Sequence, residues 1–355
     1  MRAGAGRAGL KSCATLVALL ASSACTKPVP APAEAAPKLV ERVRPAMGSE
    51  LHLTAWTADE AAANTAFDEA AYEFDRLEQL MSVWIEGSDV LRLNAAAGDH
   101  PVPVSPETRE VLTIAHEISD ETGGRFDVTF AALSGLWKFD TQNKDNTVPD
   151  QREILKRLPL INYKDLIVDE QAGTAFLRRK GMSVNLGGIG KGYAVDRAVA
   201  IFRKHGLKDF MIQAGGDMYV AGKRGDRPWR LGIRDPRGPA DKSFATLDLS
   251  ESTFSTSGDY ERFFMKNGRR YHHIIDLSVG EPAMKCRSVT LVTDRAVIAD
   301  ALAKGVFILG PNEGMALIER LPHVEGVIVS ATNDVLISSG LRDRLTMLAP
   351  PTDAP

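Results

Sequence analysis

A glycine-rich turn followed directly by a helical pattern constrains this chain more than any other feature. In "SVNLGGIGKGYAVDRAV", residues 183–199, glycines stand at positions 187, 188, 190 and 192, and the spacing after them predicts a helix to about residue 205. Such turns let a backbone approach a ligand closely, and the following helix directs unpaired N–H groups at an anion. The spacing is G-x-G-x-G, not the dinucleotide fingerprint, and a Walker loop would need glycine at Asn185 and serine or threonine at Gly192. A tight strand–helix connection without a ligand remains the alternative.

Composition narrows the class of protein. Of the 355 residues, 44% are hydrophobic and 25% are charged, and the net charge is −3. These values are typical of a soluble globular protein with one large or two modest domains. Because the chain has no excess of basic residues, nucleic acid is not expected as its main partner.

The N-terminus carries a predicted export signal. Basic residues precede the short apolar run "CATLVALLASSA", residues 13–24, which predicts a signal peptide over 1–24 that is too short to span a bilayer. Cys25 follows directly, as at a bacterial lipoprotein cleavage site, so we expect a lipid anchor at Cys25 on a bacterial membrane, facing the periplasm or the exterior. Ordinary cleavage with Cys25 unmodified is the alternative. Cys286 then stands alone, without a disulfide framework.

Further boundaries follow from the pattern along the chain. The Pro/Ala-rich segment 25–40 predicts a tether, 41–348 a folded domain, and 349–355 a flexible tail. Residues 50–56 alternate as a strand, Thr57 and Glu60 form a capping box for a helix towards Gln79, and Ser105-Pro106 begins a helix that ends at Gly123-Gly124. A short helix is predicted over 150–158, and strands over 174–179 and directly before the glycine turn.

The C-terminal half reads mostly as β-structure. Short strands are predicted at "FMIQAG", "DMYVAG", "WRLGI", "SVTLVT", "EGVIVS" and "DVLISS", with a helix over 294–309. Asn267-Gly268 between alternating arms predicts a hairpin with a type I′ turn. Because helices and strands neither alternate regularly nor segregate, we predict a mixed α+β fold with a β-rich C-terminal half.

Eight segments in order resemble the ApbE family, the FAD:protein FMN transferases, from about residue 45 to residue 310. They are "AMGSE", "LMSVWIEGSDVLRLN", "GGRFDVT", "NLGGIGKGYAVD", "QAGGDMYVAG", "STSGDYERF", "HHIIDLSVG" and "ADALAKGVFILG". The resemblance implies an ApbE-like fold with a flavin site between sub-lobes. It also implies a magnesium-assisted reaction in which the FAD diphosphate is split, FMN passes to a Thr or Ser hydroxyl of an acceptor flavoprotein, and AMP leaves.

The resemblance also implies the residues that bind FAD. Trp84 takes the position of an aromatic that lies against the isoalloxazine ring, and an indole keeps a face for stacking; a core aromatic is the alternative. Met47 would pack on the other side of the flavin. The remaining implied contacts to the cofactor are Arg125, Phe126, Asp127, Asn185, Lys191 and Ile275. Asn185 stands where the family has aspartate, which removes a negative charge.

The implied metal site departs from the family. Asp300 and the Gly188 carbonyl match its magnesium ligands, but Lys304 stands at the position of a threonine ligand. A protonated lysine has no lone pair and cannot be a ligand. Three outcomes are open. Lys304 turns away or pairs with Asp300 and leaves a weak magnesium site; its ammonium takes the place of the metal; or the chain only binds flavin. We expect the first outcome, because the remaining motifs keep their chemistry.

His273 matches the family histidine that precedes I-I-D. It is the expected base for the acceptor hydroxyl, since histidine titrates near neutrality, and Asp300 is the second expected catalytic residue. Its neighbour His272 would point to the opposite face of the strand. Two other kinds of site are alternatives: a zinc site from His272, His273 and Asp276, and a serine hydrolase site using Ser255 or Ser257, which lack a nucleophile elbow. A flavin-binding lipoprotein that only hydrolyses FAD, or transfers nothing, is the main alternative.

Overall fold

An eight-stranded sheet forms the centre of the folded domain. The computed structural model describes residue 9, residues 36–139 and residues 146–354. Every neighbouring pair in the sheet is antiparallel. The strands, in spatial order, are β1 (Lys38–Ala46), β2 (Ser49–Thr57), β6 (Phe210–Ala214), β7 (Asp217–Ala221), β11 (Ser252–Gly258), β16 (Cys286–Val292), β17 (Glu325–Ser330) and β18 (Val335–Ile337).

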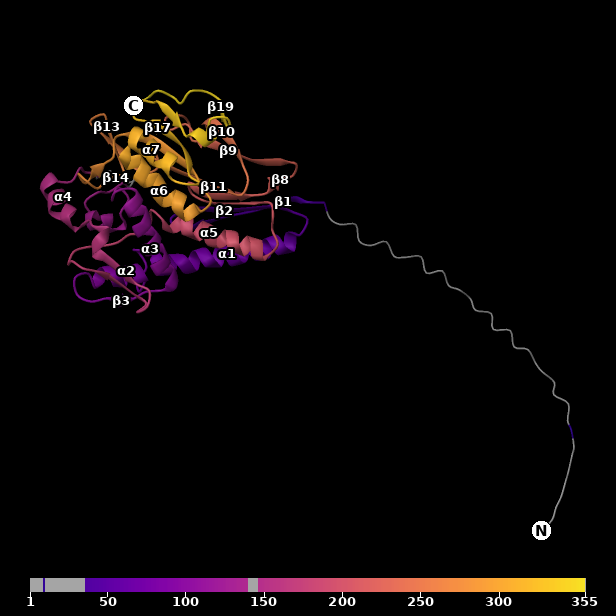
Figure 1. Cartoon of the computed structure of the whole chain (residues 1–355), viewed down its shortest axis with the longest axis horizontal. Helices are drawn as coiled ribbons and strands as arrows, with labels where there is room; N and C mark the ends of the chain where they lie inside the picture. The colour runs from indigo at the N-terminus through magenta and orange to yellow at the C-terminus, as the bar shows by residue number, and fades with distance from the viewer. Residues whose placement is uncertain (1–8, 10–35, 140–145, 355) are drawn as a thin grey trace, which may run out of the picture. The chain divides into compact units, whose positions relative to one another are not determined.

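Helices cover one face of this sheet. The described helices are α1 (Glu60–Met81), α2 (Asp89–Ala95), α3 (Pro106–Glu121), α4 (Gln151–Arg157), α5 (Gly190–Lys204), α6 (Ala296–Leu309) and α7 (Pro311–Arg320). Helices α1 and α5 lie side by side (Figure 1). Alanines and phenylalanines repeat every three to four residues along α1, and this face is buried in the main core.

A smaller sheet covers the other face. Its strands are β19 (Leu345–Met347), β10 (Ser243–Leu249), β9 (Arg227–Arg234) and β8 (Lys223–Arg224). Between the two sheets lies a second core, in which Val220 and Phe254 of the large sheet pack with Trp229, Leu231 and Phe244 of the small one. The domain therefore has three layers: helices, the large sheet and the small sheet.

Three small sheets and four 3₁₀ helices complete the described secondary structure. Their elements are β3 (Val102–Pro103), β4 (Leu166–Asp169), β5 (Thr174–Leu177), β12 (Phe263–Lys266), β13 (Arg269–His272), β14 (Ile275–Asp276), β15 (Glu281–Pro282), and the 3₁₀ helices η1 (Val128–Leu133), η2 (Leu158–Leu160), η3 (Tyr163–Asp165) and η4 (Ser339–Leu341). Strands dominate after residue 209, so the predicted α+β class and β-rich C-terminal half are confirmed.

Local signals in the sequence are confirmed at several turns and caps. The Ser105 hydroxyl accepts the N–H of Thr108 and Pro106 begins α3. Asn267 and Gly268 have positive φ values of 51° and 74°, which a type I′ turn requires. A second turn of this kind joins β1 to β2, where Met47 has φ 47°.

Three predicted features differ in the structure. Helix α1 is capped by Asp59, whose carboxylate accepts the N–H of Ala62, and Thr57 instead accepts the N–H of Asp59, so the capping box of Thr57 with Glu60 is wrong. The predicted strand before the glycine turn is irregular over 182–189. Strand β1 begins at Lys38, inside the predicted tether, because pairing with β2 extends to Lys38 opposite Thr57.

The C-terminal segment is attached to the domain rather than being the flexible tail we expected. Ala349 donates its N–H to the Phe244 carbonyl, and the Thr352 N–H and hydroxyl bond to Asp235. These contacts hold residues up to 353 against β10 and the loop after β9, where polar backbone groups find partners.

The predicted signal peptide, Cys25 and the tether up to residue 35 lie outside the described residues. Within the part of the chain that the structure describes, no helix combines the length and apolar character needed to cross a bilayer.

Candidate functional site

The glycine turn brings α5 against α6. A Cβ on Gly192 would lie 2.3 Å from the Ala296 carbonyl oxygen and 2.8 Å from the Asp300 Cβ, so only glycine fits there. The Gly192 N–H donates to Asp300 Oδ2 at 3.0 Å. One reason for the glycines is therefore close packing of two helices, and this packing places the start of α5 beside Asp300.

Asp196 of the same segment strengthens this junction. Its carboxylate accepts the N–H groups of Ala296 and Val297 at 2.7 and 3.1 Å and so caps α6 from α5. Burial raises the pKa of Asp196 to about 6, although both N–H bonds and Arg295 oppose the shift. The role of this aspartate is to hold the two helices in register.

Four charged residues meet below the turn; we call Lys191, Asp217, Asp300 and Lys304 the lysine–aspartate cluster. Lys191 Nζ lies 2.8 Å from Asp217 Oδ2 and 3.7 Å from Asp300 Oδ2. Lys304 Nζ donates to the Asp300 backbone carbonyl at 2.7 Å and to its Oδ1. Ser255 donates its hydroxyl to Asp217. The structure therefore brings together Lys191, Asp300 and Lys304, as predicted, and adds Asp217, which sequence reasoning missed.

The cluster keeps its charges. Asp300 is 0% exposed, and burial alone would raise its pKa, but the charges of Lys191 and Lys304 and two hydrogen bonds hold the pKa below its usual value. Burial likewise opposes the charge of Lys191, yet Asp217 and Asp300 raise its pKa above the ordinary value. Lys191 is therefore a cation and Asp300 an anion at neutral pH.

Gly188 lies next to the cluster. A Cβ on Gly188 would lie 3.2 Å from Lys304 Cδ and 3.4 Å from Phe126 Cε2. The stem of Lys304 thus passes between Asp300 and the backbone of the glycine turn. Its side chain is 20% exposed, and two of its three ammonium donors are already used within Asp300. The third donor has no partner among the residues that the structure describes, so it is available to a ligand.

The residues present do not fit a divalent cation as they lie. One Asp300 oxygen accepts Lys304 and the other accepts the Gly192 N–H, so a magnesium ion bound to Asp300 would lie close to the Lys304 ammonium, which repels it. Two ammonium groups balance the two carboxylates and leave no net negative charge for a dication. Within the described residues, no group of three or more His, Cys, Asp or Glu side chains has a metal-binding arrangement. The zinc site from His272, His273 and Asp276 is therefore not formed.

His273 is held neutral beside this cluster. Burial is the main cause that lowers its pKa to about 3, and the neighbouring charges of His272, Lys304 and Arg262 lower it further. Its Nδ1 is buried and has no hydrogen-bond partner among the described residues. A neutral ring with a free nitrogen is able to accept a proton, but this pKa lies well below the neutral value that we expected from sequence.

His272 has a structural role. It is buried, donates from Nε2 to the Ala283 carbonyl at 2.6 Å and packs edge-on against Phe307. The structural role predicted for His272 is confirmed. Ser255 is committed to Asp217, which leaves no serine–histidine pair of the hydrolase kind at this position.

Met47 and Trp84 both lie near the C-terminal end of α1. The Met47 N–H, in the β1–β2 turn, donates to Glu78 Oε2 at 3.2 Å, and Glu78 is in the last turn of α1. Trp84 follows the helix by three residues and is 90% exposed. The alternative of Trp84 as a core aromatic is therefore wrong, and its indole face is available for stacking. Glu78, which sets the Met47 turn, carries no recognisable signal in the sequence.

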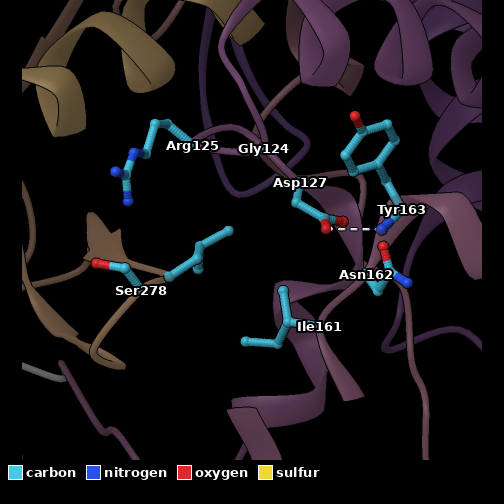
Figure 2. A pocket seen from close by; sticks show the side chains of 8 residues that line it. Gly124, Arg125, Asp127, Ile161, Asn162, Tyr163 and Ser278 are labelled. Atoms are coloured by element: carbon cyan, nitrogen blue, oxygen red, sulfur yellow. Dashed lines mark hydrogen bonds between the residues drawn. The ribbon is translucent and has the colours of Figure 1, made fainter. Parts of the chain in front are cut away.

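A cavity of about 200 Å³ lies beside the loop that begins at Gly123. Figure 2 shows Arg125 and Ser278 on one side, with Asp127 and Tyr163 across from them. The Arg125 guanidinium lies 3.7 Å from Asp276, which also accepts the Ser278 hydroxyl and N–H. The turn after the β14 strand is therefore built on Asp276.

Asp127 has a structural task that we did not predict. Its carboxylate accepts the N–H and hydroxyl of Thr129 and the N–H of Tyr163, and burial raises its pKa. These three bonds commit most of the acceptor capacity of the carboxylate to the fold. Asn185 similarly uses Oδ1 to accept the Gly187 N–H at 2.8 Å and shapes the glycine turn itself. Ile275 is buried in β14.

The ammonium groups of Lys191, at the start of α5, and of Lys304, on α6, are both partly exposed and offer positive charge to an anionic ligand. Comparisons with known proteins agree. The ApbE family model matches residues 47–328. FAD:protein FMN transferases from Klebsiella pneumoniae and Treponema pallidum are 31% and 32% identical, over 85% and 81% of this chain and 92% and 83% of theirs. The solved ApbE structure from Thermotoga maritima has a TM-score of 0.79 and 29% identity, covering 86% of this chain and 99% of that one. The flavin transferase ApbE from Vibrio cholerae has a TM-score of 0.77 and 25% identity, covering 87% and 99%. The chain belongs to the ApbE family.

Proposed function

We propose that this chain is an FAD:protein FMN transferase. The oxygen of a Thr or Ser hydroxyl on an acceptor flavoprotein attacks the phosphorus on the FMN side of the FAD diphosphate. A phosphoester bond to FMN forms, the bond between the two phosphates breaks, and AMP leaves with the bridging oxygen. The hydroxyl proton passes to a base, and the flavin keeps its oxidation state. The naming of both relatives as FAD:protein FMN transferases supports this reaction.

The single observation that carries the proposal is the lysine–aspartate cluster beside His273. Lys304 keeps one ammonium donor free, and Lys191 lies at the start of α5, where helical N–H groups favour an anion. A diphosphate gains negative charge on its leaving oxygen as it breaks, and fixed cations stabilise that charge. The aspartates hold the cations in place from a position that a substrate does not reach.

His273 accepts the proton of the acceptor hydroxyl in this account. Bound FAD brings negative charge close to the ring, and an opposite charge raises the pKa of a histidine. The value of about 3 in the ligand-free protein therefore rises when the substrate binds. His273 is then a base only when FAD is present, which limits wasteful proton transfer.

Magnesium assistance, which the resemblance implied, is not assigned a step here. In this chain the ammonium of Lys304 takes the place of a metal ligand, bonds to Asp300 and supplies positive charge directly. The Lys304–Asp300 pair of the first outcome, which we expected from sequence, is present. We nevertheless infer the second outcome, in which the ammonium takes the place of the metal, because the two lysines already balance the two aspartates. A Mg²⁺ requirement of wild-type protein would contradict this part and leave the transfer reaction intact.

Trp84 and Met47 hold the isoalloxazine end in this proposal. Both lie at the end of α1, and the exposed indole offers a face of suitable size for a tricyclic ring.

We also propose export and anchoring at a bacterial membrane through Cys25, on the basis of the apolar run and the Pro/Ala-rich tether. A Cys25→Ser variant should leave the membrane fraction for the soluble exported fraction. Native protein that carries no lipid by mass spectrometry would exclude the anchor.

The direct test incubates purified protein with FAD and an acceptor domain bearing a Thr flavinylation motif. Covalent flavin fluorescence on the acceptor and release of AMP are the expected result. FMN and AMP released without covalent product would instead support the alternative of an FAD-hydrolysing lipoprotein, and FAD binding without turnover would support a purely flavin-binding one.

A further inference from the structure

A second cavity, of about 300 Å³, lies beside β13. We call it the arginine cavity. It is lined by four arginines from separate parts of the chain, Arg237 after β9, Arg269 and Arg270 on β13, and Arg287 on β16, together with Asp259 and His272. None of the residues that we assign to FAD lines it. Its size is at the lower end for small-molecule sites.

Three of the four guanidinium groups are paired. Arg237 makes two bonds of 2.7 Å to Asp259. Arg269 lies 3.0 Å from Glu281. Arg287 donates to two backbone carbonyls and to Asn333 and lies 3.3 Å from Asp353.

Arg270 is different. Its closest carboxylate oxygen, on Asp259, is 3.9 Å from Nε and already serves Arg237. It makes no hydrogen bond to the described residues, and its Nε is buried without a partner. The guanidinium packs over the Phe263 ring at 4.0 Å, and its side chain is 16% exposed. A guanidinium stays charged in proteins, so this cation is held where neither water nor a carboxylate fully satisfies it.

The residues around Arg270 make its positive charge still less favourable. Burial lowers the pKa of Arg270, and repulsion from Arg237 and Arg287 lowers it further. Three of the four arginines have a carboxylate partner, namely Asp259, Glu281 or Asp353, and only Asp259 lines the cavity, so the positive charge of Arg270 has no carboxylate of its own. Met265 and Met284 also line it and are each about half exposed, so the cavity has apolar wall as well as charge.

We propose that the arginine cavity binds a small organic anion, in which an oxyanion headgroup (phosphate or carboxylate) pairs with Arg270 and an attached apolar group contacts the methionines. Planar guanidinium donors match either headgroup in a two-bond geometry. The site does not depend on FMN transfer, since it shares no assigned residue with the flavin site.

Calorimetric titration of the full chain tests the proposal. The probes are phenyl phosphate and benzoate at matched ionic strength, so that the two headgroups are compared on one apolar body. Wild-type protein should bind at least one probe saturably. Arg270→Met should weaken that binding roughly 10-fold or more, because a charge-assisted hydrogen-bonded pair is lost. Arg227→Met is the matched control: Arg227 is highly exposed and lies beside Asp226 only, so binding should not change.

Thermal unfolding shows whether the Arg270 variant is folded and whether it binds the probe. Without ligand, Arg270→Met should be at least as stable as wild type, since it removes a buried charge without a partner. The bound probe should raise the Tm of wild type and not that of Arg270→Met. If Arg270→Met does not fold, Arg270→Lys keeps the charge but not the two-bond geometry and should bind more weakly than wild type. No saturable binding of either probe, or equal binding by a folded Arg270 variant, would overturn the proposal; equal binding would place the anion at the lysine–aspartate cluster instead.

Discussion

Replacement of Lys304 by threonine is the perturbation that most sharply separates this chain from a metal-dependent enzyme. The ammonium bonds to the Asp300 carbonyl and carboxylate, and its third donor is free for a phosphate oxygen. Two unit charges at 4 Å attract by about 4 kcal/mol at an effective dielectric constant near 20. Loss of one donor aimed at developing charge commonly costs about 100-fold in rate. We therefore expect Lys304→Thr in EDTA to transfer FMN about 100-fold more slowly than wild type.

The same substitution should create a metal requirement. Threonine adds a hydroxyl, and removal of the ammonium frees one Asp300 oxygen, so added Mg²⁺ should restore at least roughly a tenth of the wild-type rate. Wild-type transfer should be insensitive to EDTA. Covalent flavin on the acceptor, measured by in-gel fluorescence with and without Mg²⁺, gives both rates. Lys156→Thr is the matched control, because Lys156 also pairs within its own helix, with Glu153, but lies at the surface.

Two results would refute this reasoning. Wild-type transfer that stops in EDTA would show that a metal, not the ammonium, supplies the charge. Lys304→Thr that works as well as wild type in EDTA would show that neither the ammonium nor its replacement contacts the reacting phosphates. In either case Lys304 would be a positioning partner of Asp300 only.

Three more changes test other parts of the account. The fluorescence of Trp84 should be quenched when FAD binds, and Trp84→Ala should weaken FAD binding, measured by calorimetric titration, by about 1–2 kcal/mol through lost stacking. Tyr72→Ala, at an exposed aromatic elsewhere on α1, should not weaken it. Equal FAD affinity of Trp84→Ala and wild type would remove Trp84 from the site. Gly192→Ala should lower the free energy of unfolding in urea by about 3 kcal/mol, since the added Cβ would lie 2.3 Å from a backbone oxygen of α6. Gly190→Ala should be nearly neutral, because an added Cβ there meets no packed neighbour within 4 Å. Similar losses in both variants would contradict the packing argument. The free energy of unfolding should fall as the pH drops below about 6.5, because His273 takes up a proton in the unfolded chain but, with a pKa of about 3, not in the folded one. His273→Asn should reduce this fall by about 1–2 kcal/mol at pH 5. An unchanged pH profile in the variant would show that the ring is not buried in its neutral form.

Local chemistry in the sequence predicted much of the fold. The Ser105 cap, the Asn267-Gly268 turn and the β-rich C-terminal half depend on neighbouring residues, and each is confirmed. Strand β1 was missed because it is an edge strand that contains Pro45, and because Arg42 and Arg44, which pair with aspartates of α1, hide its apolar alternation. Its pairing with β2, and not its own composition, makes it a strand.

The candidate site, like the fold, could be predicted only in part from the sequence. Gly188, Lys191, Asp300 and Lys304 were predicted to meet, and the packing of α5 on α6 brings them together. The partner role of Asp217 was not predictable, because it depends on β7 lying below α5. The low pKa of His273 likewise arises from burial and from charges far away in the sequence, neither of which a motif records.

The central claim is that this chain moves FMN from FAD onto a protein hydroxyl. Mass spectrometry of an acceptor domain after incubation with purified protein and FAD tests it most directly, with the acceptor Thr→Val variant as control. The account predicts an acceptor heavier by one FMN less water, at the threonine, with one AMP released for each FMN attached. An unmodified acceptor, with FAD either intact or split into free FMN and AMP, would contradict it.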